Sequence, residues 1–113
     1  MTEKRLFQRI PIKGQVKIFS DNVTYCCGLT NISEKGLFIT TKEHFPIGKE
    51  VEVEVVHTYS DKEAIKFPIK VRRALKTDDS TRHPDNHGMG VEVINPPAHY
   101  LNFVSDLKVY YFF

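Results

Sequence analysis

EVEVEV, residues 50–55, decides the fold class of this chain of 113 residues. Valine stands at every second position and glutamate fills the positions between, so the pattern repeats with a period of two. Such alternation is typical of a β-strand that turns one face to the core and the other to water. Pro46-Ile47-Gly48, directly before it, supplies the residue types that tight turns prefer. The sequence therefore predicts a half-buried strand over 51–55, entered through a turn.

The same period of two recurs along most of the chain. Apolar and polar residues alternate from Ile10 to Phe19, and Ser20-Asp21-Asn22 offers turn chemistry before the next alternating run. Pro68 lies on the outer side of a later run, which predicts an edge strand or a bulge at that point. The predicted strands are 10–19, 23–29, 37–39, 51–55, 65–71 and 89–93.

The period changes only near the end of the sequence. After Pro96-Pro97, a pair suited to the start of a helix, apolar residues fall at helical spacing: Tyr100, Leu101, Phe103, Val104 and Leu107. Six antiparallel strands followed by one helix predict a mainly-β fold, a small closed or partly closed barrel with the helix packed on it. We expect residues 10–113 to form this unit. Residues 1–9 show no apolar period and are expected to form a flexible N-terminal arm.

Length and composition limit the class of protein. A chain of this size suits a single domain, and 41% hydrophobic with 27% charged residues is ordinary for a globular protein. The net charge of +2 is too small for a general binder of polyanions such as nucleic acids. Residues 1–20 lack the continuous apolar core of a secretory signal, and no stretch reaches the length of a membrane span. These features predict a cytoplasmic protein without membrane insertion.

Catalytic and metal-binding motifs are not found in the sequence. Pro84, between His83 and His87, prevents the helical spacing at which paired histidines bind zinc. Metalloprotease, hydrolase and phosphate-loop patterns are missing. Cys26 and Cys27 are adjacent, so in a strand they point to opposite faces and are most simply two reduced thiols. The sequence predicts a protein that is not an enzyme and holds no metal or cofactor.

Two short clusters in the first third of the chain carry the functional information. Arg5 and Arg9 are spaced by four, which places both on one side of the backbone in a strand or a helix. Asn31 and Ser33 share one face at the end of a strand, and Gly36 permits a sharp turn or a close approach of another segment. Two guanidinium groups with a small polar cluster suit a planar anion such as a nucleotide.

The order Arg5-x-x-x-Arg9, strand, Asn31-x-Ser33-x-x-Gly36 resembles the PilZ domain, the bacterial receptor module for cyclic di-GMP. The likeness continues through NISEKGLFI at 31–39 and GMGVEV at 88–93, and it runs from Arg5 to about Leu107. It implies a PilZ-type β-barrel with a C-terminal helix and cyclic di-GMP as the ligand.

The resemblance also implies a role for each motif residue. The arginine pair, Arg5 and Arg9, takes the guanine edges and phosphates of the ligand. Asn31 and Ser33 hydrogen-bond guanine or the sugar-phosphate ring from the barrel surface. Gly36 shapes the turn that presents them.

Two further residues are candidate ligand contacts. Lys4, directly before the first arginine, matches a position that in this family influences whether one ligand or an intercalated pair is held. Arg73 falls on the apolar side of its strand, so it either reaches out to the surface or faces a groove. Ligand binding is expected to order the arm across the barrel, and that change is the signal to an unidentified effector protein.

Three other interpretations stay open. In the first, the chain is a PilZ-like protein-interaction module that binds no nucleotide. In the second, it is a small barrel that binds nucleic acid through basic and aromatic strand faces, although the near-neutral charge and the glutamates of 50–55 count against this. In the third, it is a purely structural interaction module and both motifs are coincidental.

The apolar run Val109-Tyr110-Tyr111-Phe112-Phe113 has two expected fates. It continues the buried stripe of the helix through Tyr111, or it forms an exposed apolar patch of the kind that marks partner surfaces. Helical spacing cannot bury every one of these side chains on one face. Part of the run is therefore expected to contact the effector or a second subunit in a homodimer.

Overall fold

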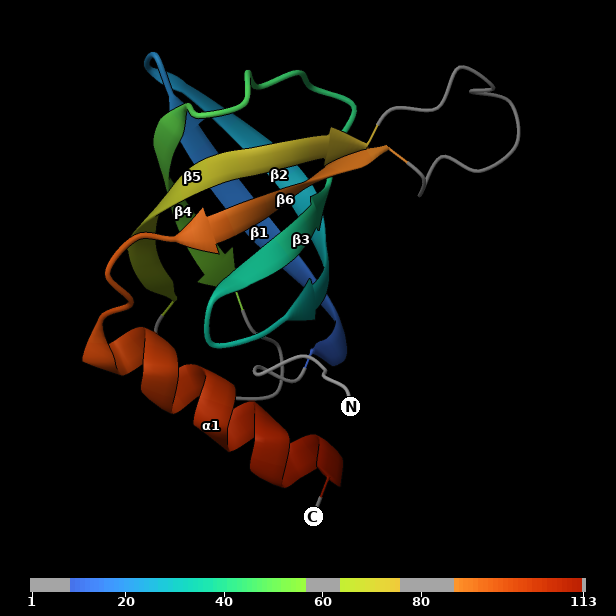
Figure 1. The fold of residues 1–113 in the computed structure, drawn as a ribbon, viewed down its shortest axis with the longest axis vertical. Coiled ribbons are helices and arrows are strands. Elements are labelled where there is room, and N and C mark those ends of the chain that lie inside the picture. The colour runs from blue at the N-terminus through green and yellow to red at the C-terminus, as the bar shows by residue number, and fades with distance from the viewer. Residues whose placement is uncertain (1–8, 57–63, 76–86, 113) are drawn as a thin grey trace, which may run out of the picture.

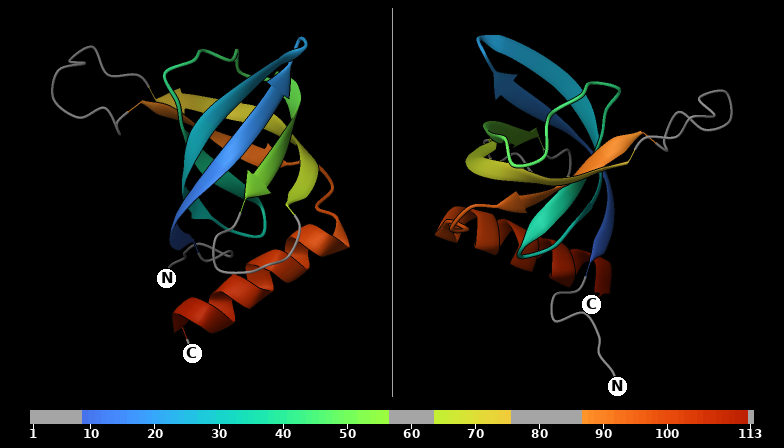
Figure 2. Two further views of the ribbon diagram at one scale, coloured as in Figure 1. Left: turned by 180° about the vertical axis from the view of Figure 1, so that it is seen from behind. Right: turned by 45° about the horizontal axis from the view of Figure 1, so that its top comes forward.

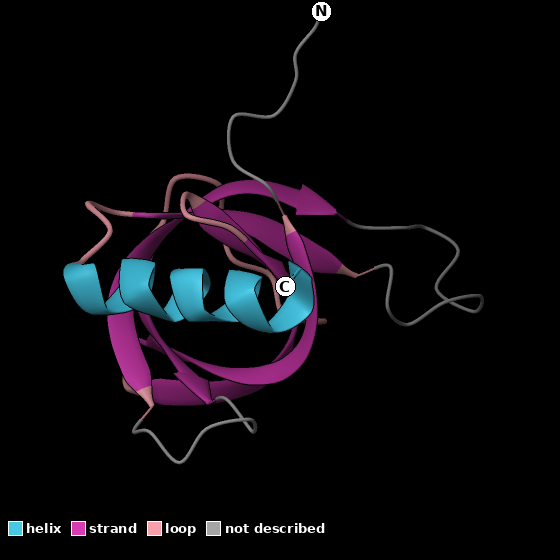
Figure 3. Ribbon diagram, turned by 90° about the horizontal axis from the view of Figure 1, so that it is seen from below, coloured by secondary structure: helices cyan, strands magenta, loops and turns pink. Residues whose placement is uncertain are grey.

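The structure of the chain, a computed structural model, describes residues 9–56, 64–75 and 87–112. Within these residues it contains six strands and one helix: β1 (Ile10–Ser20), β2 (Val23–Ile32), β3 (Gly36–Thr40), β4 (Glu50–Val56), β5 (Ile65–Leu75), β6 (Gly88–Val93) and α1 (Ala98–Phe112). The strands close into an antiparallel barrel in the order β1-β2-β3-β6-β5-β4 (Figure 1, Figure 2). The helix α1 lies across one end of this barrel (Figure 3). The predicted six-stranded antiparallel barrel with a C-terminal helix is confirmed.

Each predicted strand lies within an observed strand, but β2 and β5 run further than the alternation indicated. The pairing register shifts by one residue in β2 between Leu29 and Asn31, and in β5 between Val71 and Arg73. Each shift is a β-bulge, which turns the following side chains to the other face and so breaks the period of two. The alternation ends at the bulge, although the strand continues beyond it.

The strand β5 has a neighbour on both sides in the closed barrel, so of the two expectations for Pro68 the edge strand is wrong. A bulge is present in β5, but it lies between Val71 and Arg73 and not at Pro68. Pro68 stands opposite Glu52 of β4. Its carbonyl accepts a hydrogen bond of 3.0 Å from the amide of Ile94, just past the last residue of β6. Because the N–H and C=O of a strand residue point to the same side, the donor that proline lacks also faces the end of β6. The proline therefore removes no bond between β5 and β4.

The turns follow the chemistry of their residues. Asp21 and Asn22 join β1 to β2 with φ angles of 52° and 66°, the positive values that a two-residue hairpin turn of type I′ needs. Gly48 has a φ of 93°, and the amide of Lys49 donates to the carbonyl of Pro46 at 3.0 Å. At the start of α1, the carbonyl of Pro97 accepts bonds from the amides of Tyr100 and Leu101.

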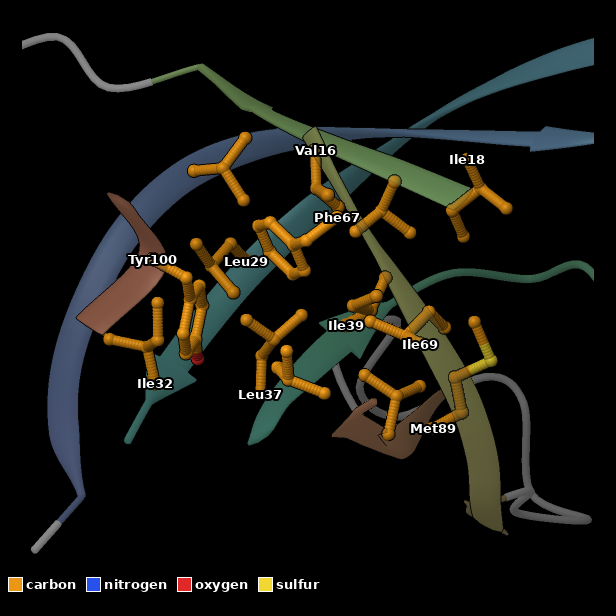
Figure 4. Packing of buried hydrophobic residues seen from close by; sticks show 14 of the residues in the cluster. Val16, Ile18, Leu29, Ile32, Leu37, Ile39, Phe67, Ile69, Met89 and Tyr100 are labelled. Atoms are coloured by element: carbon orange, nitrogen blue, oxygen red, sulfur yellow. The ribbon is translucent and has the colours of Figure 1, made fainter. Parts of the chain in front are cut away.

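The barrel core consists of inward side chains from all six strands, and α1 closes one end of it. The valines of the EVEVEV stretch are all buried, as predicted. On α1 the buried side chains lie on one helical face: Tyr100, Val104 and Leu107. Tyr100 is fully buried, and its ring lies 4.6 Å from that of Phe67, centroid to centroid. Figure 4 shows Tyr100 pointing in among the strand side chains, so α1 is anchored in the core.

The outer face of α1 carries apolar side chains, since Leu101 is 39% and Val109 is 60% exposed. The helix continues to Phe112. The side chains of Tyr110, Tyr111 and Phe112, and the whole of Phe113, lie outside the described residues, so the two fates of this run stay a prediction. No helix in the described part of the chain combines the length and the apolar character needed to cross a bilayer.

Gly36 lies where two strands approach too closely for a side chain. It is the first residue of β3 and stands opposite Glu92 of β6. A Cβ atom at this position would lie 2.1 Å from the carbonyl oxygen of Val91, which is backbone and cannot swing away. Of the two reasons that the sequence offered for this glycine, the close approach of another segment is the one observed.

We predict that Gly36→Ala destabilises the barrel. The added methyl group must push β3 from β6, at a cost of about 1–3 kcal/mol or more. Gly28→Ala is the matched control, because a Cβ atom there meets the Cβ of Thr40 at 3.5 Å, an ordinary contact. Urea denaturation should give a lower free energy of unfolding for Gly36→Ala and a change within about 1 kcal/mol for Gly28→Ala. Equal stability of the two variants would show that the β3–β6 contact adjusts freely.

Candidate functional site

A groove of about 340 Å³ lies on the barrel surface where the turn before β3 meets β5 and β6. Four of the predicted site residues line it: Arg9, Ser33, Gly36 and Arg73. They come from the residue just before β1, the turn between β2 and β3, and the far part of β5, so the fold brings together residues up to 64 positions apart. Arg5 and Lys4 lie outside the described residues, and their place at this groove stays a prediction.

Arg9 is held by the predicted polar cluster itself. One guanidinium nitrogen, Nη1, donates a hydrogen bond of 2.8 Å to the side-chain oxygen of Asn31. The pairing of β1 with β2 brings the two together, since Pro11 stands opposite Asn31. The bulge in β2 turns Asn31 away from the core, between the buried Leu29 and Ile32. A guanidinium group has five N–H donors, so Arg9 keeps donors for a ligand.

The turn between β2 and β3, residues 33–36, is fixed by its own hydrogen bonds. The amide of Ser33 donates to the carbonyl of Gly36 at 2.8 Å. The hydroxyl of Ser33 accepts from the amide of Lys35 at 3.3 Å and makes a long contact of 3.5 Å to the Gly36 carbonyl. Ser33 is buried. Its side chain therefore shapes the turn, a role that the sequence analysis gave to Gly36.

Arg73 points outward, not to the core side on which the alternation placed it. The bulge after Val71 moves it off the inner face, and Arg73 is exposed. Its side chain lies over Gly90, where a Cβ atom would come within 3.3 Å of the Arg73 Nε. Of the two possibilities that the sequence left open, Arg73 takes the one that faces a groove.

Three charged residues of the groove were missed by the sequence analysis: Lys35, Arg72 and Glu92. Lys35 lies inside the Asn31–Gly36 motif and could have been found there. Arg72 and Glu92 come together only through the register of β5 and β6, and their side chains form an ion pair of 3.2 Å between Nε and Oε1. No periodicity in the sequence gives that register, because the bulge interrupts it.

The groove is therefore cationic, with four basic side chains and one carboxylate around it. Two of its lining residues, Gly36 and Gly90, have no side chain of their own, and the Arg73 side chain lies over Gly90. Guanidinium groups form paired hydrogen bonds with phosphates and with the acceptor edge of guanine, and they stack on aromatic rings. This arrangement suits an anionic ligand with planar parts.

A second groove, of about 530 Å³, lies along β2 near the hairpin end of the barrel. It is lined by one lysine and one glutamate, Lys42 and Glu43, and by none of the predicted ligand residues. Cys26 is exposed and Cys27 packs against the core, so the two thiols face opposite sides as predicted. Burial raises the pKa of the Cys27 thiol, which favours its protonated form.

Metal ligands do not gather in the described part of the chain, where no three His, Cys, Asp or Glu side chains lie close enough to hold one ion. His83, one of the two histidines considered above, lies outside the described residues. His87 is half-buried and lies just before β6.

Comparison with known proteins gives one family by sequence and the same type of barrel by structure. A sequence profile of the PilZ domain matches residues 3–110. No curated protein matches the chain. Among solved structures, the barrel resembles the Bacillus subtilis inhibitor of motility, MotI/DgrA, with a TM-score of 0.76 and 16% identity over 96% of this chain and 51% of that protein.

Two Escherichia coli structures, both in complex with cyclic di-GMP, are also similar at 13% identity over 96% of this chain. The PilZ domain of YcgR gives a TM-score of 0.67 and is covered over 94% of its length. The longer YcgR structure gives 0.71 and is covered over 46%. The chain thus spans about half the length of MotI/DgrA and of the longer YcgR structure. At these identities the structural likeness shows the fold.

Proposed function

Since the chain belongs to the PilZ family, we propose that it is a receptor for cyclic di-GMP. The observation that carries the proposal is the convergence of Arg9, Arg73 and the Ser33–Gly36 turn on one cationic groove. Cyclic di-GMP carries two guanines and two phosphates on a closed ring, and such a groove offers matching groups. The YcgR structures, which have the same fold, hold this ligand.

The proposed contacts follow from the chemistry of each side chain. Arg9 pairs with a guanine edge or a phosphate through the donors that Asn31 does not use. Arg5 adds the second guanidinium from the preceding residues, and Lys4 adds positive charge beside it. Arg73, lying over Gly90, stacks on a base or pairs with a phosphate.

Ligand binding is proposed to be passed on to a partner protein through the N-terminal arm. Ligand binding orders the rest of the arm of residues 1–9 across the groove, next to Arg9, which Asn31 already holds, and the ordered arm is read by an effector protein. The protein acts as a receptor, not an enzyme, in the bacterial cytoplasm, where Cys26 and Cys27 stay reduced.

Part of the C-terminal apolar run contacts the effector or a second copy of the chain, next to the exposed Val109.

A PilZ-like interaction module that binds no nucleotide is the main alternative. Glu92 favours it, because its carboxylate lies in the groove and already pairs with Arg72. Titration of cyclic di-GMP into the purified protein, followed by calorimetry, distinguishes the receptor from the interaction module. Saturable binding supports the receptor, and the lack of binding up to millimolar ligand leaves the interaction module.

Each arginine of the pair is predicted to contribute strongly to binding. Arg9→Ala and, separately, Arg5→Ala should weaken cyclic di-GMP binding by about tenfold or more, since a charge-assisted hydrogen bond contributes about 1.5–3 kcal/mol. Lys13→Ala is the control, because it removes one positive charge from an exposed position of β1 that does not line the groove. Without ligand, all three variants should melt like the wild type. Wild-type affinity in both arginine variants would contradict the assigned site.

The groove is predicted to select cyclic di-GMP over related nucleotides. Linear pGpG and GTP should compete poorly in the same calorimetric assay, because the closed ring presents both guanines and both phosphates without an ordering cost. Cyclic di-AMP should also fail, since adenine places a donor where guanine O6 accepts from arginine. If cyclic di-AMP competes as well as cyclic di-GMP, the groove is a general anion site.

The C-terminal run is predicted to take part in assembly. Deleting residues 110–113 should lower the mass that light scattering measures at high protein concentration, because the deletion removes aromatic residues beside the exposed Val109. The dilute protein, measured in parallel, serves as the monomer reference. A truncation that leaves both the assembly state and the melting temperature unchanged would exclude a role for the run in function.

A further inference from the structure

Two contacts join α1 to the Ser33–Gly36 turn of the candidate site. The hydroxyl of Tyr100 donates a hydrogen bond of 2.6 Å to the carbonyl of Ser33. Two helical turns further on, Lys108 forms an ion pair with Glu34, the next residue of the turn. No described residue of α1 lines the groove. The helix also packs on β1 and β5, and its direct contacts with the turn include those of Tyr100 and Lys108.

The Tyr100 contact is rigid. Tyr100 is fully buried and packed on Phe67, so its hydroxyl has little freedom to move. Burial, and then the nearby charge of Glu34, raise the pKa of Tyr100 far above its ordinary value. The hydroxyl therefore remains a donor at every physiological pH, and it fixes the peptide group of Ser33. The amide of the same residue makes the bond that closes the turn.

The Lys108 contact is partly buried, with 30% of the lysine and 25% of the glutamate side chain exposed. Within the described residues, the second carboxylate oxygen of Glu34, Oε1, is buried without a hydrogen-bond partner. The charge of Glu34 thus depends on Lys108 for compensation. Removal of one member of such a pair leaves an uncompensated charge and is more costly than the loss of a surface pair.

We propose that Tyr100 and Lys108 are positioning residues for the ligand site, so that the seating of α1 and the binding of nucleotide are energetically coupled. This inference rests on the proposed function, because it concerns the same groove. A shift of α1 moves Ser33 and Glu34 relative to Arg9 and Arg73, which are held by β1 and β5. By thermodynamic linkage, the ligand must in turn affect α1 as much as α1 affects the ligand.

Tyr100→Phe tests the first contact. It keeps the ring on Phe67 and removes only the hydroxyl, which leaves the Ser33 carbonyl without its donor. Cyclic di-GMP affinity, measured by calorimetry, should fall by about fivefold or more. The control is Lys49→Ala, which breaks the 3.3 Å ion pair of Lys49 with Asp21 near the β1–β2 turn. It should leave the affinity unchanged.

Glu34→Gln separates positioning from direct electrostatics, because the two predict opposite signs. Removing a negative charge near a cationic groove strengthens the binding of an anion if only charge matters. If the ion pair positions the turn, the variant binds cyclic di-GMP more weakly. The charge exchange Glu34→Lys with Lys108→Glu should recover most of the affinity that either single change loses.

Hydrogen exchange tests the coupling directly. If Tyr100 and Lys108 only stabilised the fold, ligand binding would not change amide exchange in α1. In the wild type, cyclic di-GMP should slow amide exchange in residues 104–108 of α1, which do not line the groove. The effect should disappear in Tyr100→Phe. If the wild type binds cyclic di-GMP but Tyr100→Phe and Glu34→Gln bind it equally well and α1 exchange is unaffected, the coupling is refuted and the receptor function stands. If the wild type itself does not bind, both proposals fail together.

Discussion

The close contact between Gly36 and the backbone of Val91 is the constraint on which the rest of the structure depends. The pairing of β3 with β6 joins the first half of the chain to its last strand and so closes the barrel. A side chain at position 36 would force these strands apart. Because Gly36 also ends the turn that begins at Ser33, the same contact fixes one wall of the groove. Closure of the fold and the shape of the candidate site therefore depend on one position.

Charged residues on the outer face support this closure by matching neighbouring strands. Glu54 of β4 stands opposite Lys17 of β1 and Lys66 of β5. Cross-strand pairs of opposite charge stabilise a sheet by about 0.2–1 kcal/mol each and disfavour other registers. Glu50 likewise stands opposite Lys70, so Glu50 and Glu54 of EVEVEV, a stretch that counted against a nucleic-acid interface, have a structural role. The cationic surface is formed elsewhere, by Arg9, by Lys35 of the turn, and by Arg72 and Arg73 at the bulge of β5.

The strands and the helix could be predicted from the sequence because alternation and helical spacing are local patterns. The two bulges could not, since they appear only when partner strands are aligned, and they decide where Asn31 and Arg73 point. The sequence named Arg9 and the Ser33–Gly36 turn correctly as neighbours, whereas the pair of Arg72 with Glu92 needs the β5–β6 register. The bond from Tyr100 to Ser33 joins residues 67 positions apart, and no local pattern indicates it.

Several polar groups of the groove, those of Arg9, Ser33 and the Arg72–Glu92 pair, already have partners within the protein, which would limit how a ligand can bind. Arg9 is fixed by Asn31, and the Ser33 hydroxyl is held within its turn. Groups fixed in advance lose less entropy on binding, so in the proposed receptor the Arg9 donors that Asn31 does not use are already positioned for the ligand. In the coupling proposed above, the same fixed contacts make the site sensitive to residues that do not line it. A turn held by its own hydrogen bonds moves as a unit, and Tyr100 and Lys108 are attached to that unit from α1.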